Sequence, residues 1–223
     1  MIPLDVISDP ICPWCWIGKT RLDRAIAAAG GPPPFEIRWR PFQLNPDMPR
    51  EGMDRAEYLA AKFGGREAAE RVYANVEAAC EEAGLDFDHS RIKRTPNTLD
   101  AHRVIRWAQV EGDQGAAVDK LFDLHFLAGR DISDPDVLIE AGAAAGLKRE
   151  VVEELLASDA DLDVVRAEDA AAREMGVSGV PTFIIAGKYV VQGAQDSEFW
   201  SKVIAELTEA QGAEGAGDRP DEG

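Results

Sequence analysis

Two cysteines in a Cys-Pro-Trp-Cys stretch at residues 12–15 constrain this chain more than any other feature. They follow a short apolar run, 2–7, and open an amphipathic segment, 19–29, which predicts a strand, a tight turn and a helix. The first turn of a helix has unpaired N–H groups and a partial positive charge, so a thiolate is favoured there. We expect Cys12 to be the more exposed nucleophile and Cys15, one turn further in, to be the resolving thiol.

A Cys-x-x-Cys pair has two other common uses, in a metal site and in a structural disulfide. Zinc needs further ligands, and the remaining candidates are Cys80, His89, His102 and His125, none of which forms a second pair at short spacing. A disulfide that closes so short a loop stabilises a chain little. The sequence therefore favours a pair that cycles between dithiol and disulfide, without a metal.

Charge and length narrow the class of protein. The formal net charge of −17 argues against nucleic acids and anionic membrane surfaces as partners. No basic and apolar leader follows Met1, and no apolar run is as long as a membrane span, so the sequence predicts a cytoplasmic protein. The 223 residues allow one large domain or a domain with a substantial insertion.

Apolar periodicity predicts strands near both ends of the chain and helices between them. Residues 35–42 alternate apolar and charged side chains and are expected to pair in parallel with 2–8. Near the C-terminus, 182–185 and 189–192 flank a turn and predict an antiparallel hairpin, followed by a helix at 196–210. The other expected helices, most of them ending at glycines, are 13–29, 58–63, 68–83, 98–112, 116–128, 135–145, 150–156 and 161–175.

This order divides the chain into a split α/β domain, an inserted all-helical domain and a tail. The α/β domain is expected at residues 1–45 and 161–211, with the helical insertion at 46–160. Residues 212–223 consist largely of Gly, Ala, Asp and Glu, and we expect them to be disordered.

Three stretches of the chain together resemble one family. They are Ser8-Asp9-Pro10-Ile11-Cys12-Pro13-Trp14-Cys15, Asn97-Thr98-Leu99-Asp100-Ala101-His102-Arg103 and Gly176-Val177-Ser178-Gly179-Val180-Pro181-Thr182-Phe183. In this order they resemble the FrnE-like group of DsbA-family dithiol–disulfide oxidoreductases and isomerases, which is related to 2-hydroxychromene-2-carboxylate isomerases and kappa-class glutathione transferases. The resemblance implies an α/β thioredoxin fold with an inserted all-helical domain, as in DsbA.

The resemblance also implies a cis peptide bond between Val180 and Pro181 that lies beside Cys12. Such a bond would turn the Val180 backbone toward the thiol, where its N–H and C=O would pair with an extended substrate chain. The residues alone leave an ordinary trans proline equally open. Pro181 would shape the site, and Trp14 with Pro13 would offer the substrate an apolar contact.

Further contacts are expected from the glutathione-using relatives. There, the segment that matches 193–196 holds the γ-glutamyl end of glutathione, so Gln195 and Asp196 are candidate contacts, with Asp196 placed to meet the ammonium group. The alternative for Asp196 is that it only caps the last helix. His102 and Asn97 are candidate substrate contacts, and their alternatives are a packing histidine and a helix cap. No cofactor is required, and glutathione is a candidate co-substrate.

Departures from the family bear on the chemistry. Trp14 stands where periplasmic relatives often have histidine, so the thiolate lacks that cation and the pair is expected to be less oxidising. The isomerases commonly have serine where Cys12 stands, so the two cysteines of this chain favour dithiol chemistry.

His125 and Phe126 match an aromatic position that lines the family's groove, with plain core as the alternative. Cys80 is expected to be a buried helical thiol.

The sequence therefore predicts an enzyme in which Cys12 attacks a substrate disulfide and Cys15 resolves the mixed disulfide. Its expected partners are protein or peptide thiols and disulfides and glutathione, and the related proteins add a homodimer to the expected assemblies. One alternative is a glutathione-dependent isomerase or transferase acting on a small aromatic substrate, in which Cys12 only orients glutathione. Another is a binding module that uses the groove beside Trp14.

Overall fold

The computed structural model describes residues 1–32 and 34–217, and within them a mixed sheet has the strand order β2-β1-β5-β6. β1 (Ile2–Ser8) pairs in parallel with β2 (Phe35–Pro41). β5 (Thr182–Ile185) runs antiparallel to β1, and β6 (Tyr189–Gln192) forms the edge of the sheet. The parallel pair and the hairpin expected from the sequence are confirmed.

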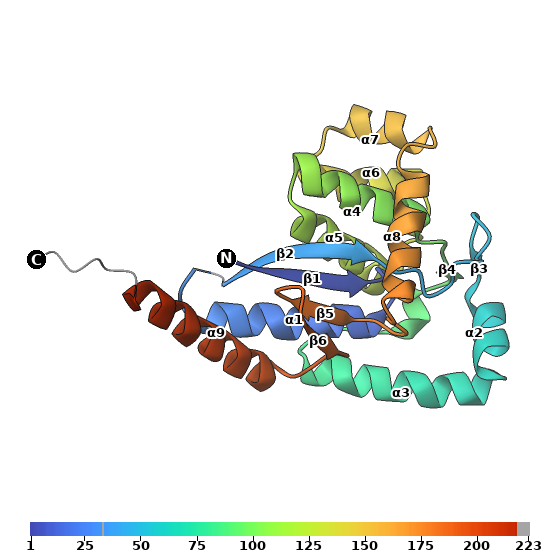
Figure 1. The fold of residues 1–223 in the computed structure, drawn as a ribbon. Helices are drawn as coiled ribbons and strands as arrows, with labels where there is room; N and C mark the ends of the chain where they lie inside the picture. The colour runs from blue at the N-terminus through green and yellow to red at the C-terminus, as the bar shows by residue number, and fades with distance from the viewer. Residues whose placement is uncertain (33, 218–223) are drawn as a thin grey trace, which may run out of the picture.

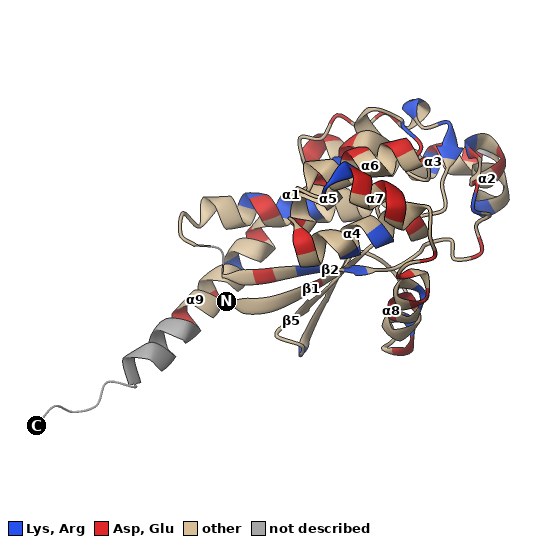
Figure 2. Cartoon of the chain, turned by 90° about the horizontal axis from the view of Figure 1, so that it is seen from above, with Lys and Arg blue, Asp and Glu red and all other residues tan. Residues whose placement is uncertain are grey.

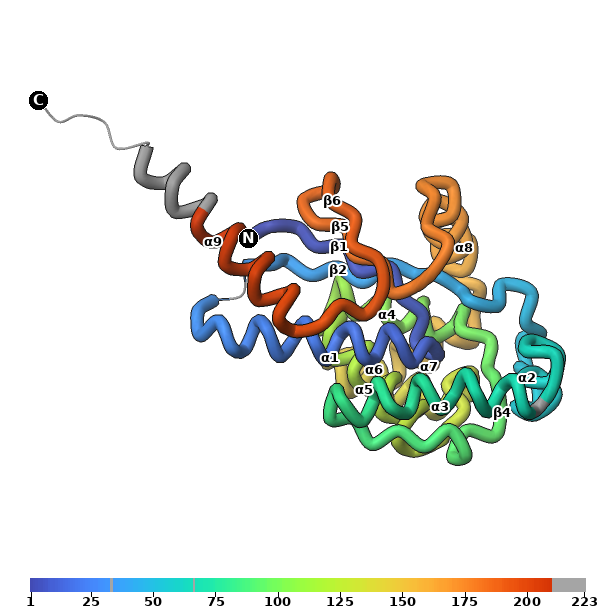
Figure 3. Tube along the Cα trace, turned by 90° about the horizontal axis from the view of Figure 1, so that it is seen from below, coloured from blue at the N-terminus to red at the C-terminus, as the bar shows by residue number. Residues whose placement is uncertain are grey.

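Two helices from opposite ends of the chain cover one face of this sheet. α1 (Pro13–Ala28) and α9 (Ser197–Gly217) pack side by side there (Figures 1 and 3). The indole of Trp200 is fully buried and meets the ring of Phe183 edge to face, with ring centroids 4.8 Å apart. A buried aromatic pair of this kind fixes the closing helix against the sheet.

The last helix is longer than the sequence predicts. The expected helix ends at residue 210 and the expected disordered tail begins at 212, but α9 continues to Gly217. Alanine, glutamate and glutamine are good helix formers, and they extend a helix that the sheet already anchors. Residues 218–223 of the expected tail lie outside the described residues.

The segment between β2 and β5 is almost entirely helical, as expected. Its helices are α2 (Arg55–Phe63), α3 (Arg66–Glu82), α4 (Leu99–Glu111), α5 (Gln114–Phe122), α6 (Pro135–Ala144), α7 (Arg149–Leu156) and α8 (Leu162–Glu174). Both α4 and α5 pack against β2. α8 returns to the sheet and stands on the opposite side of it from α1 (Figure 2). Lys and Arg are interspersed with Asp and Glu along these helices (Figure 2).

Two details of the insertion differ from the expectation. β3 (Met53–Asp54) and β4 (Arg94–Thr95) form a small antiparallel ladder where the sequence predicts no strand. Two-residue strands carry no period-2 pattern, and their pairing depends on how distant segments pack. The helix expected at 116–128 is α5 followed by a π-helical turn, Asp123–Leu127.

The apolar core runs from the sheet through α1 into the insertion without a break. Trp16 of α1 stacks on Phe126 of the π-helical turn, with ring centroids 5.1 Å apart. Phe87 meets Phe126 edge to face at 5.7 Å. The inserted helices therefore pack directly behind the N-terminus of α1, where the cysteines lie. No helix in the described part of the chain is long and apolar enough to cross a membrane.

Candidate active site

The loop between β1 and α1 places both cysteines at the helix N-terminus. Cys12 is the N-cap of α1, and its N–H donates to the Asp9 carbonyl at 2.9 Å. Cys15 lies in the first turn, and its N–H donates to the Cys12 carbonyl at 3.0 Å. Pro13 occupies the first helical turn, as expected. Both cysteines are free thiols, and Cys12 is only marginally more exposed, at 3% against 1%.

The loop that precedes β5 lies directly against Cys12. The Val180–Pro181 peptide bond is cis, which confirms the expectation drawn from the family resemblance. The Cys12 Sγ donates to the Val180 carbonyl oxygen at 3.6 Å. The sulfur of Cys12 and the backbone of Val180 are therefore neighbours.

Gly18 is a residue of this site that sequence reasoning missed. A Cβ at Gly18 would lie 3.0 Å from Pro181 Cγ and 3.5 Å from Ala194 Cα. The missing side chain therefore lets the Pro181 loop rest on α1. The available signal is a glycine inside an otherwise helical pattern, which often marks a close approach of another segment.

The environment of the Cys15 thiol disfavours its ionisation. Burial raises the pKa of the Cys15 thiol well above its ordinary value of 9.0. A hydrogen bond to Cys12 and the charge of a Cys12 thiolate raise it further, whereas hydrogen bonds to the Ser8 side chain and the Asp9 backbone lower it. The Cys15 thiol therefore holds its proton to a higher pH than an ordinary thiol does.

A cation of the insertion, Arg55, contacts Tyr73. Burial raises the pKa of the Tyr73 hydroxyl, and the charge of a Cys12 thiolate raises it too, whereas Arg55 lowers it. The Arg55 guanidinium donates to the Tyr73 hydroxyl and, at 3.0 Å, to the Thr95 hydroxyl. It lies 5.5 Å from the centroid of the Tyr73 ring. No pattern in the sequence indicates that Arg55 pairs with Tyr73.

Of the predicted substrate contacts, Trp14 is open to solvent, whereas Gln195, Asp196 and Asn97 make hydrogen bonds within the protein. Trp14 is 38% exposed and stays available to a substrate. Arg21 Nη1 donates to the Ala194 carbonyl at 2.7 Å and so holds the 193–196 segment against α1. Within it, Gln195 Nε2 donates to the Gln192 carbonyl at 2.7 Å.

Asp196 caps the last helix, because its Oδ1 accepts from the Phe199 N–H at 2.7 Å. Asn97 Nδ2 donates to the Met48 carbonyl at 2.7 Å, and its Oδ1 accepts from the Leu99 N–H at 2.9 Å. His102 is 3% exposed and lies behind the active-site loop. The structure thus places Asn97 and His102 in the framework of the site rather than at its open side, and their role as substrate contacts stays a prediction.

The remaining candidates belong to the core. His125 and Phe126 are both almost completely buried, which confirms the alternative that they are ordinary core residues. Cys80 is fully buried, and burial raises the pKa of its thiol to about 12, as expected of an unreactive helical thiol. Among the described residues, no group of His, Cys, Asp or Glu side chains is placed to hold a metal ion.

Two buried histidines lower the free energy of unfolding as the pH becomes acidic. Burial lowers the pKa of His102 to about 4 and that of His125 to about 3, below the ordinary 6.5. As pH falls from 6.5, the unfolded chain takes up protons that the folded chain refuses, so stability is lost. Asp9 acts in the opposite sense, because burial raises its pKa to about 7 and the folded chain holds its proton over the same range.

Replacing His125 with leucine is therefore expected to protect the protein from acid. Between about pH 6.5 and pH 4 the variant should lose about 3 kcal/mol less free energy of unfolding than the unchanged protein, because one histidine no longer titrates. Urea unfolding at several pH values measures this difference. Equal losses in the two proteins would show that His125 is not held neutral by burial.

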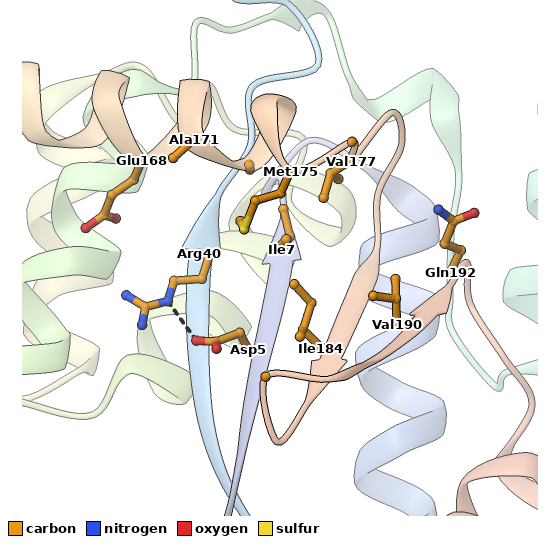
Figure 4. A pocket seen from close by; sticks show the side chains of 13 residues that line it. Asp5, Ile7, Arg40, Glu168, Ala171, Met175, Val177, Ile184, Val190 and Gln192 are labelled. Carbon is orange, nitrogen blue, oxygen red and sulfur yellow. Dashed lines mark hydrogen bonds and ion pairs between the residues drawn. The ribbon is translucent and has the colours of Figure 1, made fainter.

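A groove of about 570 Å³ lies between α8 and the strands, on the face of the sheet opposite α1 and α9 (Figure 4). Ile7, Ile184 and Val190 form part of its floor, and Met175 of the turn after α8 leans over it. An ion pair between Arg40 and Asp5 closes one side, with 2.8 Å between Nε and Oδ1. None of the predicted site residues lines this groove.

Comparison with known proteins agrees with this geometry. The family model of the DSBA-like thioredoxin domain matches residues 3–205. Protein YwbO of Bacillus subtilis (strain 168), whose function is uncharacterized, is 25% identical over 206 residues, which are 92% of this chain and 96% of YwbO. A probable DsbA oxidoreductase of Streptomyces coelicolor is 30% identical, with a TM-score of 0.81 over 99% of this chain and 92% of its own.

Two solved structures with lower identity share the fold. A 2-hydroxychromene-2-carboxylate isomerase superposes with a TM-score of 0.68 at 17% identity, covering 95% of this chain and 98% of its own. The cytosolic disulfide reductase DsbM of Pseudomonas aeruginosa, solved with GSH, has a TM-score of 0.65 at 17% identity, covering 93% and 99%. With both cysteines at the start of α1 and the cis-proline loop beside them, the chain belongs to the family of DSBA-like thioredoxin domains.

Proposed function

We propose that this protein exchanges disulfides with peptide or protein substrates through Cys12 and Cys15. The contact between the Cys12 Sγ and the Val180 carbonyl, 3.6 Å long, carries this proposal, because it puts a free thiol beside backbone that an extended chain can pair with. The buried partner thiol of Cys15 lies one turn behind.

The proposed reaction has two steps. The Cys12 thiolate attacks one sulfur of a substrate disulfide, the substrate S–S bond breaks, and the leaving sulfur departs as a thiolate that takes up a proton. Cys15 then loses its proton and attacks the Cys12 Sγ, which releases the second substrate thiol. The substrate disulfide is reduced to two thiols, and Cys12 and Cys15 are oxidised to one disulfide. The reverse sequence oxidises a substrate dithiol.

The substrate class follows from what surrounds the sulfur. Backbone pairing at Val180 is indifferent to side chains, and the exposed indole of Trp14 adds an apolar contact. This combination suits extended or unfolded polypeptides of varied sequence. We include glutathione in the proposal as the small thiol that returns the Cys12–Cys15 disulfide to the dithiol, in a reaction that consumes two molecules of glutathione and releases them joined as oxidised glutathione.

Trapping the intermediate tests the proposal. In Cys15→Ser the second step is blocked, so incubation with a disulfide-containing peptide or with oxidised glutathione is expected to leave a stable adduct on Cys12, visible by mass spectrometry. The unchanged protein should release the adduct and form the Cys12–Cys15 disulfide. Cys80→Ser is the matched control, because that thiol is fully buried. A Cys15→Ser protein without an adduct on Cys12 would refute the proposed reaction.

A further inference from the structure

The motif at 97–103 has no role in the exchange steps, yet it packs directly behind the active-site loop. α4 carries His102 from this motif toward Asp9 of the loop. Both side chains are buried, with 3% and 0% exposed. His102 Nε2 and Asp9 Oδ1 lie 3.9 Å apart, a gap slightly too long for a hydrogen bond.

Asp9 ties the cysteine loop to two other segments. Its Oδ1 accepts from the Ile11 N–H at 3.3 Å, and its Oδ2 accepts from the Leu44 N–H at 2.7 Å. The Thr98 side chain at the start of α4 also hydrogen-bonds to this carboxylate. Hydrogen bonds to a charged carboxylate are roughly twice as strong as those to a neutral acid. The charge on Asp9 therefore governs how firmly the residues just before Cys12 are held.

His102 presents an unfilled acceptor to Asp9. One ring nitrogen donates to the Phe42 carbonyl, and the other, Nε2, is buried without a hydrogen-bond partner among the described residues. In a neutral ring that second nitrogen is an acceptor. A buried acceptor without a donor is costly, and Asp9 can supply a donor only when it carries a proton.

We infer that Asp9 and His102 are positioning residues that share one proton, and that this proton decides how the cysteine loop is held. With the proton on Asp9, the O–H turns to His102 Nε2 and the grip on the Ile11 and Leu44 amides weakens. Without it, the carboxylate holds both amides and fixes the turn that leads into Cys12. The proton comes from solvent and returns to it. The inference rests on the proposed function, because the position of the loop affects a reaction only if Cys12 and Cys15 react.

The ionisation of both groups is consistent with such sharing near neutral pH. Burial raises the pKa of Asp9 to about 7, and burial lowers the pKa of His102 to about 4, so the ring stays neutral while Asp9 gains and loses its proton. The other charged and titratable groups around the pair are Asp169 and Arg173 on α8, Arg40 on β2, and Cys12 and Cys15 at the start of α1. Of these, Asp169 raises the pKa of both groups.

Titration of the unchanged protein tests the shared proton directly. NMR of isotope-labelled histidine and aspartate is expected to show the Asp9 carboxyl titrating near neutral pH. Over the same range, His102 Nε2 should change from hydrogen-bonded at low pH to free at high pH. In Asp9→Asn the amide N–H₂ can donate permanently, so the Nε2 signal should stop changing. A carboxyl that titrates near its ordinary value of about 4, or an Nε2 signal that ignores it, would overturn the inference.

Two variants should move the Asp9 titration in opposite directions. His102→Leu removes the acceptor of the protonated form and is expected to lower the titration midpoint by about one pH unit. Thr98→Val removes a donor to the charged form and is expected to raise it by about one unit. A purely structural role predicts no such opposition, and shifts of the same sign would overturn the inference. If His102→Leu does not fold, the titration of the unchanged protein decides.

The effect of the Asp9 proton on the exchange reaction is measured separately. The rate of exchange with a small disulfide is compared in the unchanged protein and in Asp9→Asn from about pH 5.5 to about pH 8.5. The rate in the unchanged protein divided by the rate in Asp9→Asn is expected to be near one at about pH 5.5 and to differ from one by about tenfold at about pH 8.5. A constant ratio would overturn the positioning role. If the unchanged protein exchanges no disulfide at all, the proposed function fails, while the titration above still reports on the proton.

Discussion

Cys12→Ser is expected to lower the rate of insulin reduction by roughly three orders of magnitude or more, because it removes the attacking sulfur. A serine hydroxyl at the N-cap neither ionises near neutral pH nor forms a disulfide. Cys15 cannot take over, because burial keeps its pKa well above the ordinary thiol value. Reduction of insulin by dithiothreitol, followed by turbidity, measures the loss.

The matched control for this variant is Cys80→Ser. Its thiol lies within α3 and is fully buried, and burial raises its pKa to about 12, so the variant should keep the activity of the unchanged protein. Activity that survives Cys12→Ser would favour a reaction in which this residue only orients another thiol. Activity lost in Cys80→Ser would instead indicate a third redox cysteine.

Arg103→Met is expected to lower the free energy of unfolding by about 3 to 5 kcal/mol. The guanidinium of Arg103 is fully buried, where Nε donates to the Ala160 carbonyl at 2.7 Å and Nη2 to the Ser158 carbonyl at 2.8 Å. It also pairs with Asp100 at 2.7 Å. Methionine fills much of the same volume but leaves these acceptors without donors, so the turn between α7 and α8 loses its attachment to α4.

Arg166→Met serves as the control for this substitution. Arg166 is an exposed arginine that pairs with Asp163 at 3.4 Å, and an exposed pair of this kind contributes about 0 to 1 kcal/mol. Urea unfolding of the two variants under the same conditions separates the buried network from the loss of one positive charge. A loss in Arg103→Met no larger than in Arg166→Met would mean that the carbonyls find other donors, such as water.

Long-range contacts explain most of what sequence reasoning missed in the site. Arg55 reaches Tyr73 from a different helix of the insertion, and His102 faces Asp9 across the boundary between insertion and sheet. Helical periodicity shows which side of a helix is apolar but not which element that side meets. The sequence indicates Asp9 only as part of a motif, because the burial of its side chain depends on α4 and on the segment after β2.

Local signals, by contrast, determined much of the fold. The cysteine pair at the start of a helix and the hairpin at 182–192 depend on residues adjacent in the chain, and the structure has both as expected. The hairpin turn at 186–188 shows why: Ala186 and Gly187 both adopt positive φ, at 53° and 67°, which suits the twist of the strands, and the Lys188 N–H donates to the Ile185 carbonyl at 3.0 Å. The sequence by itself therefore determined most of the helices and strands, their order along the chain and the positions of the two cysteines. Only the tertiary structure decided the neighbours of those sulfurs, because burial, charge and hydrogen bonding around them come from side chains that meet only when the insertion packs behind the loop.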